Sequence, residues 1–307
     1  MGRQRRLAGI AAGWLIALAC QASASGIYQW RDDQGKLHFG DRPPESAVPE
    51  NLSDRYNFSD NLDIIIEGMD YAVSPLLRDR LAISVRKIFA IYRQALELDY
   101  RDAREFRIVI YGDESAFRQY QQRIAPVLEN AAGFYSSLNN QITTWAIPDQ
   151  RILERLIVHE ASHAISASQG RRIPTWLNEG LAEYFEIMQV QGLSAEIPLS
   201  RHWLATLTRH GYHQQRGRLA QTVAVPHQRW YAANGPDNLS YAASWALVWF
   251  LMDSAEGRVL IRQLLAGPHP DEQSSLAIIN RHWPGGFDAL EQSWQQWLPR
   301  AQGRHRY

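Results

Sequence analysis

Two histidines and a glutamate stand at a spacing that suits metal-dependent chemistry. His159, Glu160 and His163 form the pattern HExxH within the segment HEASH. Residues four apart on a helix share one face, with Cβ atoms about 5–6 Å apart, so both rings can reach one Zn²⁺ ion at about 2.0–2.1 Å. Glu160 lies roughly 100° around the helix from His159 and about 60° from His163. It therefore stands beside the metal, where a base acting on a metal-bound water belongs.

The segment that carries this pattern is predicted to be a helix buried on most sides. Its apolar positions are Ile152, Leu153, Leu156, Ile157, Val158, Ala161, Ala164 and Ile165. A pair of buried histidines satisfied by backbone groups is the alternative interpretation. Against it, a glutamate between two histidines on an apolar helix is costly to bury without a purpose.

A third ligand is expected on the helix that follows. The chain is predicted to turn over residues 170–174, and Thr175 can cap a second helix. On that helix Glu179, Glu183 and Glu186 share one stripe. Glu179 lies in the first turn, and Glu183, one turn on, could accept a hydrogen bond from the free nitrogen of a ligating histidine. A solvated acidic helix face is the alternative interpretation of this stripe.

HEASH, followed sixteen residues after His163 by the glutamate of TWLNEGLAEYFE, resembles the gluzincin zinc metallopeptidases, specifically the peptidase MA-like families. The WLNEG signature also occurs in the aminopeptidase N family. The resemblance implies that His159, His163 and Glu179 bind zinc and that Glu160 is the general base. It also implies a zincin-like fold.

The resemblance covers roughly residues 60 to 300 and is strongest over 133–188 and 239–253. The histidine-to-glutamate spacing is a little shorter than in aminopeptidase N, and the exopeptidase motif GxMEN is absent. Both departures argue against aminopeptidase activity and favour an endopeptidase-like enzyme.

Residues 133–146 resemble the strand pair that precedes the active helix in these families. The second strand, Gln141, Ile142, Thr143, Thr144 and Trp145, is expected to form the sheet edge that lines the cleft. An extended peptide can pair with such an edge through its backbone. An ordinary hairpin is the alternative.

Tyr241 matches the place where related families carry a tyrosine. Its hydroxyl could donate a hydrogen bond to the oxyanion of a tetrahedral intermediate. Aromatic packing at the start of a core helix is the alternative.

The first 24 residues are typical of a signal peptide. Three arginines precede an apolar run, Leu7 to Cys20, and Ala22-Ser23-Ala24 fits a cleavage site. The run is too short to span a bilayer comfortably. The prediction is export to the periplasm or cell envelope of a bacterium, with a buried N-terminal helix or a lipoprotein anchored through Cys20 as the alternatives.

Residues 25–50 are predicted to form a small β-hairpin module, followed by a linker over 51–60. Residues 26–44 resemble a small domain of unknown function that is common after bacterial signal peptides, with the pattern IYxWxDxxGxxHFxDxPP. This stretch could bind an envelope partner. It carries no chemistry of its own.

Composition limits the partners and the metal ligands. The 307 residues include 32 basic and 32 acidic side chains, with 45% hydrophobic and 21% charged residues, which indicates a globular protein of one or two domains. Zero net charge gives no reason to expect nucleic acid as a partner. Cys20 is the single cysteine, so a metal must be held by nitrogen and oxygen ligands.

The predicted fold class is α+β, because strands cluster early and helices late. Strands are predicted at 62–67, 106–111, 134–137 and 141–146, with helices at 76–98 and 113–123 and mostly helices after 149. Residues 239–253 are expected to be a buried helix and 301–307 a disordered tail. The metallopeptidase domain is expected to span 61–300.

These observations favour an exported zinc-dependent endopeptidase that hydrolyses peptides or proteins with a metal-activated water. One alternative is a zinc-binding envelope scaffold without turnover. Another is an amide hydrolase that acts on cell-wall peptides.

Overall fold

The computed structural model describes residues 28–31, 37–40, 50–51, 62–98, 105–128, 131–168, 172–192, 194–233, 237–268 and 274–307. The chain divides into two compact units, Met1–Phe58 and Ser59–Tyr307. The predicted signal peptide, with Cys20, lies outside the described residues, and so does residue range 52–60 of the predicted linker.

The first unit contains the predicted hairpin. Strands β1 (Tyr28–Arg31) and β2 (Leu37–Gly40) pair antiparallel, with Tyr28 opposite Gly40. A third strand, β3 (Glu50–Asn51), pairs with the other edge of β1. The module is therefore a three-stranded sheet that includes Asn51, which was predicted to begin the linker.

The second unit opens with a four-stranded sheet in the order β4-β5-β7-β6. Its strands are β4 (Asp63–Met69), β5 (Glu105–Tyr111), β6 (Gly133–Ser136) and β7 (Gln141–Trp145). Strands β4, β5 and β7 run parallel to one another, and β6 pairs antiparallel with β7. The predicted edge strand is wrong: β7 is paired on both sides, and the hairpin's first strand, β6, forms the edge.

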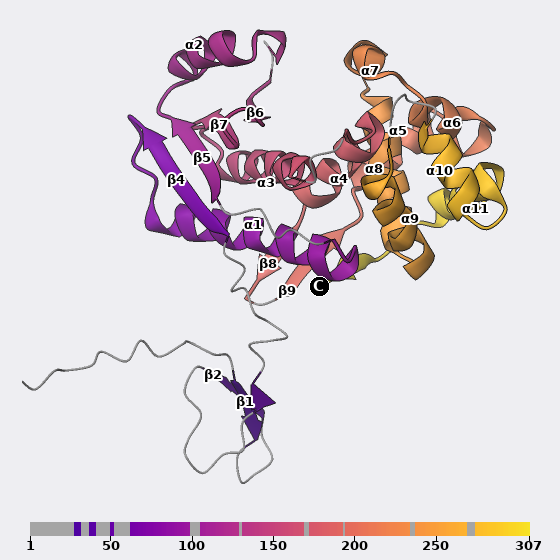
Figure 1. Cartoon of the computed structure of the whole chain (residues 1–307), viewed down its shortest axis with the longest axis horizontal. Helices are drawn as coiled ribbons and strands as arrows, with labels where there is room; N and C mark the ends of the chain where they lie inside the picture. Colours follow the sequence, from indigo (N-terminus) through magenta and orange to yellow (C-terminus); the bar gives the residue numbers. More distant parts are fainter. Residues whose placement is uncertain are drawn as a thin grey trace, which may run out of the picture. The chain divides into compact units, whose positions relative to one another are not determined.

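The helices associated with this sheet begin at the capping residues their sequences offer. They are α1 (Pro75–Ala95), α2 (Glu114–Ile124) and α3 (Gln150–Ala167). Ser74, Asp113 and Asp149 each accept a backbone N–H in the first turn through the side chain. A 3₁₀ turn, η1 (Pro126–Leu128), follows α2. Figure 1 shows α1 and α3 lying beside the sheet, with α2 beyond the end where β6 lies.

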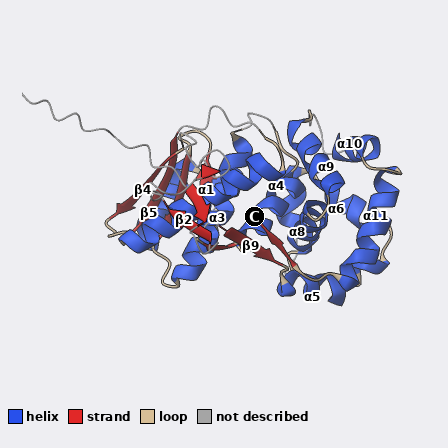
Figure 2. Ribbon diagram, turned by 90° about the horizontal axis from the view of Figure 1, so that it is seen from below, coloured by secondary structure: helices blue, strands red, loops and turns tan. Residues whose placement is uncertain are grey.

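Most of the remaining chain is helical (Figure 2). The elements are α4 (Thr175–Glu186), α5 (Arg201–Arg209), η2 (Tyr212–Gln214), α6 (Arg218–Val223), α7 (His227–Ala233), α8 (Leu239–Met252), α9 (Ala255–Ala266), α10 (Ser274–His282), α11 (Gly286–Trp297) and η3 (Leu298–Arg300). As predicted, α8 is buried along nearly its whole length. Helix α4 packs closely on it at Gly180, where a Cβ atom would lie 2.7 Å from the Ser244 carbonyl oxygen.

A second small sheet closes the unit, in the order β10-β9-β8. Its strands are β8 (Gln189–Gln191), β9 (Ser194–Pro198) and β10 (Arg304–Arg306). The prediction of a disordered tail over 301–307 is wrong. His305 is buried, while Arg304 and Arg306 on either side form ion pairs with Glu196 of β9. Pairing with β9 thus makes this short segment a strand, with side chains that alternate between the inside and the outside.

The described residues form a mixed α+β structure, as the sequence predicts. Among them, no helix is both long and apolar enough to cross a membrane.

Candidate metal centre

Helix α3 presents two histidines on one side and is anchored on another. Leu153 and Ile157 are buried in the core. Farther along, the Tyr92 hydroxyl of α1 lies 3.0 Å from Ser162 Oγ and 2.9 Å from Ser166 Oγ. These contacts fix the rotation of the helix, because a residue pattern that buries one face determines where the other face points.

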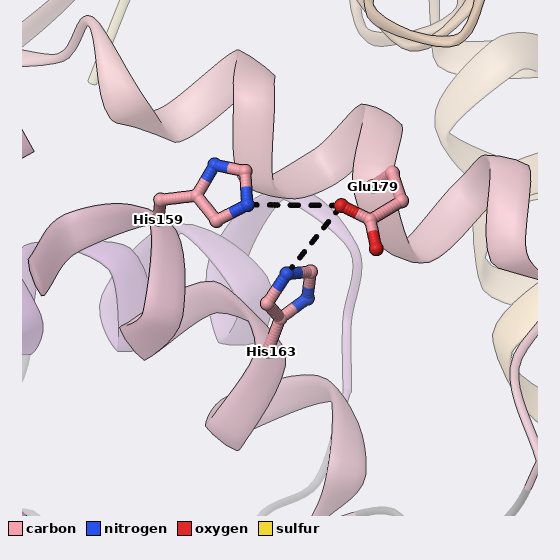
Figure 3. A group of neighbouring side chains, drawn as sticks. All are labelled: His159, His163 and Glu179. Atoms are coloured by element: carbon pink, nitrogen blue, oxygen red, sulfur yellow. Dashed lines mark ion pairs between the residues drawn. The ribbon is translucent and has the colours of Figure 1, made fainter. Parts of the chain in front are cut away.

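His159, His163 and Glu179 come together (Figure 3). Glu179 Oε2 lies 3.7 Å from His159 Nε2 and 3.6 Å from His163 Nε2. The two imidazole rings are nearly perpendicular, with centroids 4.8 Å apart. Glu179 is only 5% exposed.

These three side chains fit a zinc ion. Tetrahedral ligands at about 2.0–2.2 Å from zinc lie roughly 3.3–3.6 Å from one another. The two measured nitrogen-to-oxygen separations are close to that range, and all three ligand atoms lie within 4.8 Å of one another. The donor set of two imidazoles and one carboxylate is one that leaves a fourth position for water or substrate.

Glu160, the candidate base, is bound to the edge strand of the sheet. Its Oε2 accepts a hydrogen bond of 2.9 Å from the backbone N–H of Tyr135, on the edge strand β6. Glu160 and His159 both line a cavity of about 410 Å³, together with Gly133 of β6 and Ile152 of α3. The cavity thus brings the edge strand, the candidate base and a candidate ligand together.

Glu183 was predicted to accept a hydrogen bond from a histidine of the metal centre, and this prediction is wrong. Glu183 Oε1 lies 4.0 Å from His159 Nδ1, beyond hydrogen-bond distance, and Glu183 Oε2 accepts a hydrogen bond of 2.9 Å from Trp203 Nε1. Glu186 Oε2 is instead 3.3 Å from His159 Nδ1. Glu186 Oε1 in turn accepts a hydrogen bond of 2.6 Å from Arg155.

The acidic surroundings attract positive charge. Burial by itself would lower the pKa of His159, but the nearby carboxylate of Glu179, the hydrogen bond to Glu186 and the charge of Glu160 raise that pKa well above its usual value. Burial, with the charge of Glu186, raises the pKa of Glu183 to about 7. A divalent cation would satisfy the same carboxylates that hold the proton on His159.

Tyr241 lies at the start of α8, where its ring meets that of Trp230 with centroids 5.9 Å apart. It is not among the residues that line the 410 Å³ cavity. The oxyanion role predicted for Tyr241 therefore stays a prediction.

The strand Gln141–Trp145 lies between β5 and β6, and Ile142, Thr143 and Thr144 are buried. Its backbone is therefore not the free edge that was predicted to bind substrate.

Thr175 is also not an N-cap: Pro174 holds that position, and the Thr175 hydroxyl lies 3.0 Å from His227 Nδ1.

Arg155 is a site residue that the sequence reasoning missed. The available signal was its position four residues before His159, which places both side chains on one face of α3.

Comparison with known protein families gives two matches, and neither family has a stated activity. Residues 15–56 match a family model described as "Domain of unknown function (DUF4124)", and residues 155–264 match one described as "Protein of unknown function (DUF1570)". The first match covers β1, β2 and β3, and the second covers the HExxH histidines, Glu179 and α8. No curated protein matches the chain.

Proposed function

We propose that this protein is an exported zinc-dependent metallopeptidase of the gluzincin type, with endopeptidase-like action on peptides or proteins. The observation that carries the proposal is the convergence of His159, His163 and Glu179 with Glu160 alongside. The sheet with β6 at its edge, followed by α3 and α4, supports a zincin-like arrangement.

His159, His163 and Glu179 would hold the zinc ion, which would supply Lewis acidity for activating water and polarising a carbonyl group. Glu160 accepts the proton of the attacking water and later passes it to the leaving nitrogen. Because Tyr135 holds Glu160 Oε2, we assign the proton transfer to Oε1. Ile152 and Leu156 give one side of the cavity an apolar lining.

The edge strand β6 is the part of the sheet suited to bind an extended substrate. Only β7 pairs with it among the described strands, and its Tyr135 N–H points to Glu160. Since the Tyr135 N–H is donated to Glu160, a substrate would pair with the other outward-facing backbone groups of Gly133–Ser136, which would place a scissile bond next to the candidate base without demanding a particular sequence. This assignment replaces the one made for Gln141–Trp145.

Export to a bacterial envelope is proposed from the N-terminal sequence. The apolar segment after three arginines, followed by the module of β1, β2 and β3, supports it. The module is the proposed place for an envelope partner.

The test combines metal analysis with hydrolysis of a quenched-fluorescent peptide library. The purified chain is expected to hold about one zinc ion and to lose cleavage on chelation. Glu160→Gln should keep the metal and lose activity by roughly 10²–10⁴-fold. A zinc-loaded chain without cleavage would favour the envelope scaffold, and cleavage restricted to cell-wall peptides would favour the amide hydrolase. A preparation without zinc, unchanged by chelation, would overturn the proposal.

A further inference from the structure

The two candidate histidine ligands differ in what holds their second ring nitrogen. His159 Nδ1 lies 3.3 Å from Glu186 Oε2. His163 Nδ1 is buried and has no hydrogen-bond partner among the described residues. Both Nε2 atoms face Glu179. One ligand is therefore oriented by a side chain and the other by packing.

The side chain of Glu183 is hydrogen-bonded to Trp203 and not to His159. Trp203 of α5 donates its indole N–H to Glu183 Oε2 at 2.9 Å. Ser200 caps α5: its side chain accepts the Trp203 backbone N–H and so fixes the first turn of the helix. The other oxygen of Glu183 remains 4.0 Å from His159 Nδ1, too far for a hydrogen bond.

Glu186 is held from the opposite side by Arg155. Arg155 Nη2 lies 2.6 Å from Glu186 Oε1, while Glu186 Oε2 meets His159. Arg155 and His159 are one helical turn apart, so α3 presents both donors to a single carboxylate at the end of α4. Each oxygen of Glu186 thus has its own donor.

We propose that Glu186, held by Arg155, is the positioning residue for the metal ligand His159. A carboxylate that accepts the Nδ1–H of a histidine fixes the tautomer, leaves the Nε2 lone pair free for a metal and increases its basicity. The inference rests on the proposed function, because it concerns the same metal centre. It assigns this role to a residue seven positions beyond Glu179 instead of four.

A second metal ion at His159, Glu183 and Glu186 is the competing interpretation, because these three ligand atoms also lie within 4.8 Å of one another. The hydrogen bonds from Arg155 and Trp203 engage Glu186 Oε1 and Glu183 Oε2, whereas the oxygens nearest His159 Nδ1 are Glu186 Oε2 and Glu183 Oε1. A second cation there would have to replace the hydrogen bond between His159 Nδ1 and Glu186 Oε2, and His159 would then bind metal through both ring nitrogens.

The experiment measures zinc affinity by competition with a chromophoric chelator, and zinc content, on the full chain. Glu186→Ala should weaken zinc binding about 10–100-fold, as loss of an outer carboxylate partner typically does. Glu186→Gln, which keeps an acceptor oxygen but no charge, should show an intermediate loss. Glu183→Gln is the matched control and should lose less affinity than Glu186→Gln.

Arg155→Ala provides a second variant at a half-exposed position, where folding is not at risk. It should weaken zinc binding in the same direction as Glu186→Ala, but less. Thermal unfolding of each metal-free variant separates a loss of affinity from a loss of fold.

The inference is overturned if Glu183→Gln costs as much affinity as Glu186→Gln, or if Glu186→Ala leaves affinity unchanged. It is also overturned if wild type holds two zinc ions and Glu186→Ala holds one. A wild-type chain that binds no zinc contradicts both proposals. A chain that binds zinc without cleaving any peptide contradicts the proposed function alone, since affinity is measured without turnover.

Discussion

The two helices of the candidate metal centre differ in what decides the role of each side chain. On α3, the spacing of His159, Glu160 and His163 already places two candidate ligands on one face and a candidate base beside them. On α4, Glu179, Glu183 and Glu186 share one stripe but meet three different sets of partners.

The partners on α4 come from outside the helix. Glu179 meets the two histidines, Glu183 meets Trp203, and Glu186 meets Arg155 and His159. The comparison shows that helical periodicity determines which residues share a face. The chemistry of each residue on that face is then decided by side chains that the tertiary fold brings to it.

The largest expected effect is a loss of zinc affinity, and it should differ between two glutamates of α4. Glu179→Gln removes a proposed ligand and should weaken zinc binding by more than the roughly 10–100-fold typical of an outer partner. Glu183→Gln should have a much smaller effect, because Glu183 is bound to Trp203. Competition titration with a chelator gives both numbers. Equal losses would mean that the acidic stripe acts as a diffuse charge.

The next effect is a loss of stability, and it tests how closely α4 packs against α8. A Cβ atom at position 180 would lie 2.7 Å from the Ser244 carbonyl oxygen and 2.8 Å from Val248 Cγ2. Gly180→Ala should therefore lower the free energy of unfolding by about 1–3 kcal/mol, as overpacking does. Urea denaturation measures it. A gain of about 0.4–1 kcal/mol, usual for an unobstructed glycine, would show that α4 and α8 can separate freely.

A smaller effect is expected on the rear face of α3. Tyr92→Phe removes the buried hydroxyl shared by Ser162 and Ser166 and should cost roughly 1–2 kcal/mol of stability. Zinc affinity should hardly change, because the two serine hydroxyls face Tyr92 of α1. If the variant instead loses metal without losing stability, these hydrogen bonds position the histidines directly.

The smallest expected effect concerns the strand that reaches α4 from the C-terminal segment. His305 Nδ1 lies 2.7 Å from the Tyr184 hydroxyl. Burial, which outweighs the charge of Asp253, lowers the pKa of His305 below its usual value of 6.5. The folded protein therefore keeps His305 neutral at a pH where the unfolded chain binds a proton, and stability should fall as pH drops below about 6.5.

Denaturation of wild type and His305→Gln at pH 8 and pH 5.5 tests this dependence. The difference in unfolding free energy between the two proteins should shrink at the lower pH. A difference that is constant or grows on acidification would show that His305 is protonated in the folded state.

Much of the fold could be predicted because the relevant signals are local. The apolar, β-branched runs in residues 62–67 and 106–111, the helical period of 76–98 and the apolar run of 239–253 all correspond to elements of the expected type. The pairing of β6 with β7 was also predictable, since a short turn joins the two strands.

The rest depends on contacts between distant segments. Whether β6 or β7 lies at the sheet edge is decided by β5, which pairs with β7. The tail could not be predicted to form a strand because its ion-pair partner, Glu196, lies more than 100 positions away. In the site, the HExxH pattern was enough to select the two histidines and Glu160 as candidates. The different contacts of Glu183 and Glu186 could not be predicted, because they depend on where the fold places Trp203 and Arg155.

The central claim is that three side chains bind zinc while Glu160 performs proton transfer. The most direct measurement is therefore the zinc content and the peptide cleavage rate of Glu160→Gln, next to wild type. We expect the same zinc content, about one ion per chain, with cleavage reduced by roughly 10²–10⁴-fold. Full cleavage by Glu160→Gln with its zinc in place would contradict the claim.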